Sequence, residues 1–103
     1  MAMTQEVHYE QHFVGRCSEG AGRWVATVHF SYKPFGAQVL DVARFDVAAR
    51  AMCSTTPMFL EAFALWVYHY IRAYAYQPTG IHIEVLGRSR GHGKLRTTIT
   101  GDD

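Results

Sequence analysis

The sequence predicts an α+β protein: an antiparallel sheet of about five strands, with one long helix packed across one face. Several short segments alternate apolar and polar residues, which is the period of two typical of half-buried strands. One longer segment, residues 57–76, repeats its apolar residues at helical spacing. Short turns between strands favour antiparallel pairing, and the helix must bury its apolar side. The expected element order is therefore β-β-β-α-β-β.

Size and composition indicate one domain covering residues 1–103. The chain is 49% hydrophobic and 18% charged, which is typical of globular proteins. A net charge of +1 means that attraction to nucleic acid or to an anionic membrane would require a local patch. The two cysteines, Cys17 and Cys53, have no CxxC spacing, and the first residues do not have the pattern of a secretory signal. We therefore expect a reduced, cytoplasmic protein.

The first two strands are predicted at residues 5–14 and 23–32. Both runs alternate, and the turn between them contains two glycines. If this turn closes the hairpin simply, Glu10 lies opposite His29.

A third strand is expected at residues 37–47, after a turn at Pro34 and Gly36. Its alternation is less regular, because Asp41 or Arg44 must interrupt the apolar side. A β-bulge is the expected remedy.

The helix is predicted to begin with Thr56 as its N-cap and Pro57 as its first residue. It contains Glu61 and Arg72, and such charges argue against a membrane span, so no membrane is expected as a partner. The residues expected on its core side are all large and apolar: Phe59, Phe63, Trp66, Val67, Tyr70 and Tyr74.

Two more strands are predicted after the helix, at residues 81–86 and 94–100. The connection between them is glycine-rich, and the surrounding segment is the most basic of the chain. Its basic residues are Arg88, Arg90, His92, Lys94 and Arg96. They are consistent with a solvated hairpin tip, with an acidic protein partner, or with phosphate contacts. The chain has no RRM, KH, zinc-finger or helix-turn-helix signature, so nucleic acid is not favoured.

A group of histidines on the first hairpin is the main candidate for a metal or catalytic site. His8, Glu10 and His12 share one side of a strand, with His29 across from them. This spacing follows from the pleat alone, and no HExxH or phosphate-loop motif is present. We therefore predict no metal, no cofactor and no catalytic residue.

The outer side of the helix is unusual in composition. Where a solvated side would carry Lys, Glu and Gln, it presents Leu65, Tyr68, Arg72 and Tyr76. Aromatic residues and arginine are enriched in protein interfaces. Tyr68 and Arg72 could also simply stack on one another, being four residues apart. A second copy of the chain, packed helix on helix, is another candidate partner.

These patterns together predict a small non-enzymatic adaptor or inhibitor of the kind that phages or other mobile elements encode. It would occupy a surface of a larger protein through the helix side and the basic hairpin. The alternative is a nucleic-acid-binding module that uses residues 88–96. A less favoured hypothesis is a small metalloprotein or enzyme built on the histidines.

Overall fold

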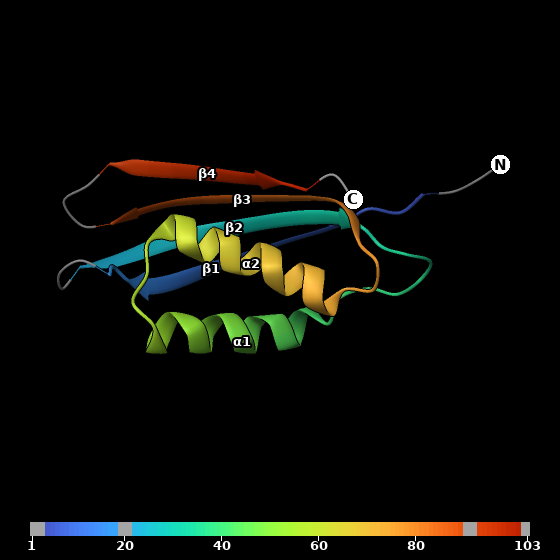
Figure 1. The fold of residues 1–103 in the computed structure, drawn as a ribbon. Coiled ribbons are helices and arrows are strands. Elements are labelled where there is room, and N and C mark those ends of the chain that lie inside the picture. Colours follow the sequence, from blue (N-terminus) through green and yellow to red (C-terminus); the bar gives the residue numbers. More distant parts are fainter. Residues whose placement is uncertain (1–3, 19–21, 90–92, 102–103) are drawn as a thin grey trace.

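The fold is α+β, with a four-stranded antiparallel sheet and two helices (Figure 1). The computed structural model describes residues 4–18, 22–89 and 93–101. The elements in chain order are β1 (Val7–Arg16), β2 (Arg23–Lys33), α1 (Val42–Thr55), α2 (Leu60–Tyr74), β3 (Thr79–Ser89) and β4 (Lys94–Thr100). The predicted class and the antiparallel sheet are confirmed, whereas the expectation of about five strands and one helix is wrong.

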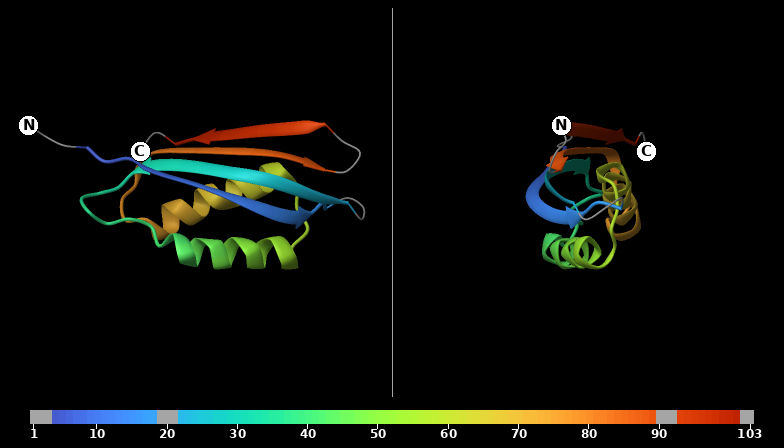
Figure 2. Two further views of the ribbon diagram at one scale, coloured as in Figure 1. Left: turned by 180° about the vertical axis from the view of Figure 1, so that it is seen from behind. Right: turned by 90° about the vertical axis from the view of Figure 1, so that its left-hand side faces the viewer.

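The strands lie in the order β1-β2-β3-β4, so each pairs with the next one along the chain. The predicted hairpin register is confirmed, with Glu10 opposite His29 and His12 opposite Thr27. Both helices lie on the same side of the sheet (Figure 2). α1 packs against β1, and α2 packs mainly against β3 and β4. The other side of the sheet, which we call the open face, is not covered by either helix.

The segment predicted as a third strand, residues 37–47, is wrong: most of it begins α1. Asp41 caps this helix, because its Oδ1 accepts a hydrogen bond from the backbone N–H of Arg44 at 3.1 Å. Phe45, Ala49 and Cys53 follow at intervals of four residues, and all three are buried. The residue that was expected to break a strand is therefore the start signal of a helix.

The predicted helix start is also wrong. Thr56 is the C-cap of α1, with its N–H bonded to the Met52 carbonyl at 3.0 Å, and α2 begins three residues after Pro57. The connection between the helices is fixed to the sheet at Met58. Its N–H donates to the Arg16 carbonyl, and its carbonyl accepts from Trp24 Nε1, both at 2.9 Å. α2 has 15 residues, and no helix in the described ranges is long and apolar enough to cross a membrane.

The core is built around Phe45 of α1, which is completely buried. Its ring contacts aromatic rings from both sheet and helix: Tyr9, Phe13, Phe30, Trp66 and Tyr70. Four of these contacts are edge-to-face and the one with Trp66 is tilted, and burying aromatic rings in such contacts is strongly favourable. One side chain therefore joins both helices to the sheet.

The predicted core side of α2 is only partly buried. Phe63 and Val67 are fully buried, as predicted. Phe59 and Tyr74 were also expected in the core, but they are 45% and 67% exposed. Phe59 precedes the helix in an extended conformation. Tyr74 is the last helical residue, and its ring is tilted against that of Tyr70 with centroids 4.4 Å apart.

Candidate functional site

The open face of the sheet is formed by alternate residues of all four strands, aligned in rows by the register. One row contains Val14, Val25, Arg88 and Lys94, taken in order from β1 to β4. β1 ends and β2 begins at the same end of the sheet where β3 ends and β4 begins (Figure 1). Residues from two separate hairpins therefore meet there.

Four exposed cations gather at this end of the open face: Arg23, Arg88, Lys94 and Arg96. We call this group the basic end. Three of the four were predicted from the basic hairpin, while Arg90 and His92 lie outside the described residues. Arg23 was missed, although it has the same strand parity as Val25 and so faces the same side.

The carboxylates of this face lie away from most of the basic end. On the described open-face strand positions the acidic residues are Glu10 and Glu84, which flank His29 in one row. Arg96 Nε is 3.9 Å from Glu84 Oε2, and both side chains are substantially exposed, so this pair contributes little to stability. Positive charge is therefore concentrated around Arg23, Arg88 and Lys94.

Exposed aliphatic side chains lie beside these cations. Val14, Val25 and Leu86 are 55%, 52% and 38% exposed. Together with Arg88 and Lys94 they line a shallow hollow of about 330 Å³. The basic end thus combines an apolar floor, formed by Val14, Val25 and Leu86, with a cationic rim.

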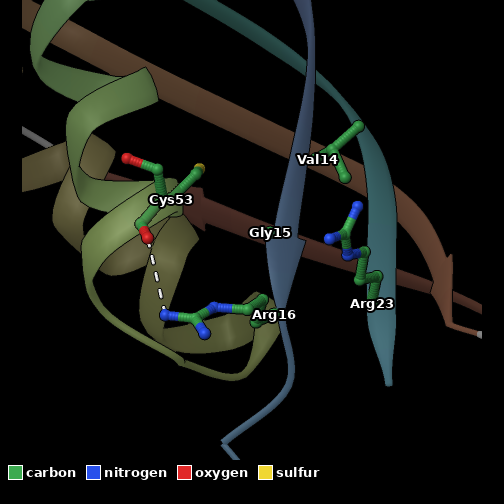
Figure 3. A pocket seen from close by; sticks show the side chains of 6 residues that line it. Val14, Gly15, Arg16, Arg23 and Cys53 are labelled. Carbon is green, nitrogen blue, oxygen red and sulfur yellow. Dashed lines mark hydrogen bonds between the residues drawn. The ribbon is translucent and has the colours of Figure 1, made fainter. Parts of the chain in front are cut away.

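A second hollow, of about 350 Å³, lies at the neighbouring end of β1 (Figure 3). Arg16 lines it and donates from Nη2 to the Ser54 carbonyl at 3.4 Å, so its guanidinium turns toward the end of α1. Cys53 lines it as well, but burial raises the pKa of this thiol to about 11. A thiol that stays protonated at neutral pH is a poor nucleophile.

The histidines do not converge on one point. His8 Nδ1 lies 3.3 Å from His29 Nε2, and the two rings are stacked. His12 instead contacts Thr27, with Nδ1 and Oγ1 3.0 Å apart. Across residues 4–18, 22–89 and 93–101, no three His, Cys, Asp or Glu side chains are grouped as metal ligands would be.

The predicted helix surface is only partly assembled. Arg72 Nη1 donates to Tyr68 Oη at 3.3 Å, and Tyr68 is half-buried against Gly101. Leu65 is 48% exposed on the same side of α2. Tyr76 is wrongly placed by the prediction, because it lies beyond the end of α2 and packs on Phe35 with ring centroids 5.4 Å apart.

No protein-family model matches this sequence, and no curated protein is significantly similar to it. The surfaces of the molecule are therefore the basis for a functional proposal.

Proposed function

We propose that this protein is a non-enzymatic adaptor or inhibitor that uses its basic end to cover an acidic surface of a larger protein. The observation that carries the proposal is the set of four cations around exposed valine and leucine side chains on an uncovered sheet face. The predicted basic hairpin contributes three of the cations. β2 contributes the fourth, Arg23.

The charge distribution favours binding of a partner at the basic end over attraction of acidic molecules to the whole surface. The net charge of the chain is +1, so long-range attraction must come from the local cluster. Complementary charge raises the association rate and orients the partner. Covering Val14 and Val25 would add hydrophobic stabilisation of about 25 cal/mol per Å² of apolar surface.

A protein partner accounts for this face better than nucleic acid does. Single-stranded nucleic acid is usually bound by aromatic side chains on which the bases stack. The described open-face positions on the four strands contain no Phe, Tyr or Trp. Aliphatic residues stand where stacking residues would be needed. The four cations among the described residues also provide a small footprint for phosphates.

Binding of defined acidic probes tests the proposal. Three labelled probes are compared at several salt concentrations: a peptide alternating Glu with Val or Leu, a poly-Glu peptide of equal charge, and a single-stranded oligonucleotide. The alternating peptide should bind most tightly, because only it offers both charge and apolar contacts. Tighter binding of the oligonucleotide, with a steep salt dependence, would favour the nucleic-acid alternative.

Charge reversal at the basic end provides the matched comparison. Arg88→Glu with Lys94→Glu should weaken peptide binding about tenfold or more, which corresponds to about 1.4 kcal/mol. Lys33→Glu, at the opposite end of β2, is the control and should leave binding unchanged. The native chain is also used as bait in host lysate, with and without nuclease. Proteins that it captures should not be captured by the double variant and should still be captured by the control variant. Equal behaviour of both variants would remove the basic end from the proposal.

A further inference from the structure

β4 has one edge that no described strand pairs with, since the sheet order places it last. The N–H of Gly101, just after β4, donates to the Ile81 carbonyl at 2.8 Å and so faces β3. Backbone groups of successive residues in a strand point to opposite sides. Lys94, Arg96, Thr98 and Thr100 therefore direct their N–H and C=O groups away from the sheet.

We propose that two copies of this chain pair antiparallel along β4, around a two-fold axis at Thr97. In this register Lys94 lies opposite Thr100 of the second copy, and Arg96 opposite Thr98. The seven residues of β4 all find a partner, and no cation faces another directly. Moving the two-fold axis to residue 96 would put Arg96 opposite Arg96 of the second copy. Moving it to residue 98 would leave Lys94 without a partner in β4 of the second copy.

The position of α2 fits the same arrangement. The helix crosses the strip of sheet formed by β3 and β4, with Leu60 against Gly87 and Tyr68 against Gly101. The two-fold axis would lie halfway between the two copies of β4, and α2 lies over the space between β3 and β4. With strands about 4.8 Å apart, the axis of α2 would therefore be about 5 Å from the two-fold axis. The two copies of α2 would then be about 10 Å apart, which is the spacing of packed helices.

Apolar side chains are exposed where this contact would form. Leu65 is 48% exposed and lies between Leu60 and Tyr68 along the helix. Leu95 is 40% exposed and Ile99 half-buried, both on the helix side of β4. In the proposed dimer Leu95 lies opposite Ile99 of the second copy. The dimer thus covers these residues and the open edge, and leaves the open face free.

Molar mass measured by light scattering over a range of concentrations tests the dimer. The native chain should have twice its mass of 11.7 kDa. Thr98→Pro removes one outward N–H that the chain's own sheet does not use, and proline is tolerated on edge strands. This variant should be folded by circular dichroism and have the mass of one chain. Thr98→Ala keeps the N–H and should remain a dimer.

Cross-linking tests the register independently of any loss of folding. The two Thr97 residues would form a non-hydrogen-bonded pair with Cα atoms about 4.5 Å apart, within the range of a disulfide. In a Cys17→Ser background, Thr97→Cys should form a disulfide-linked dimer on oxidation, while Thr100→Cys should not. A native chain of single mass at every concentration, or a dimer in which Thr97→Cys fails to cross-link, would overturn the proposal.

Discussion

The two faces of the sheet differ sharply although they are made of the same strands. Phe13 and Trp24, on the covered face, are each 2% exposed. Their neighbours in sequence, Val14 and Val25, are 55% and 52% exposed on the open face. Alternate residues thus serve separate purposes: one set holds the helices, and the other is available to a partner. Substitutions on the covered face should therefore lower stability, and substitutions on the open face should weaken binding without lowering stability.

The largest loss of stability is expected at the centre of the covered side. Phe45→Ala removes a buried ring that touches five others and should lower the free energy of unfolding by about 3–5 kcal/mol. Val47→Ala, on the same helix, is the control, since Val47 is 72% exposed. Its effect should stay within about 0.5 kcal/mol in the same urea titration. Equal losses for the two variants would contradict the assigned core.

A smaller loss is expected from Tyr9→Phe. The Tyr9 hydroxyl donates to Asp46 Oδ2 at 2.7 Å and connects β1 to α1. Asp46 Oδ1 is buried without a hydrogen-bond partner among the described residues, so this carboxylate depends on its Oδ2 contacts. Losing the hydroxyl should cost about 1–3 kcal/mol. Tyr74→Phe, at an exposed ring, should change little, and a similar cost there would argue against this explanation.

Alkaline pH should weaken the fold through Cys53. Burial raises the pKa of this thiol from 9.0 to about 11, so the unfolded chain loses the proton first. Stability should accordingly fall as pH rises from about 9 to 11, by about 1 kcal/mol between pH 8 and pH 10. Between pH 8 and pH 10 the decline should be clearly smaller in Cys53→Ala, where Tyr9 and Tyr70, whose pKa is also raised by burial, still contribute, and it should be retained in Cys17→Ala. An identical slope in Cys53→Ala would assign the effect to other groups.

The smallest effect on stability is expected on the open face. Val25→Thr suits a strand and keeps the side-chain shape, so unfolding should shift by no more than about 0.5 kcal/mol. Binding of the alternating acidic peptide should nevertheless weaken, because the apolar floor becomes polar. Unfolding and titration measurements on the same sample test both parts. A large loss of stability with unchanged binding would reverse the roles of the two faces.

The sequence predicted the elements whose apolar pattern is regular, and it failed where the pattern is irregular or where pairing between distant strands decides. Strict alternation in residues 23–32 was sufficient to predict a strand, and the short turn before it was sufficient for the hairpin register. α1 was missed because residues 37–47, whose alternation is short and irregular, were interpreted as a strand. The capping Asp41 and the four-residue spacing of Phe45, Ala49 and Cys53 were signals that could have identified it.

The basic end shows the same limit. Arg88, Lys94 and Arg96 are close in sequence, so their clustering was evident from the chain alone. Arg23 joins them only because β2 pairs with β3, with Val25 opposite Arg88. Pairing between strands separated by two helices depends on tertiary packing, which alternation does not encode.

The positions at which β1 begins and β4 ends have a practical consequence. β1 begins and β4 finishes at the end of the sheet remote from Arg23, roughly 30 Å away at about 3.3 Å per strand residue. A tether joined before Val7 would thus attach the molecule to a bead or sensor chip with its cations at the far end of the sheet. A fused fluorescent label should likewise leave them unshielded.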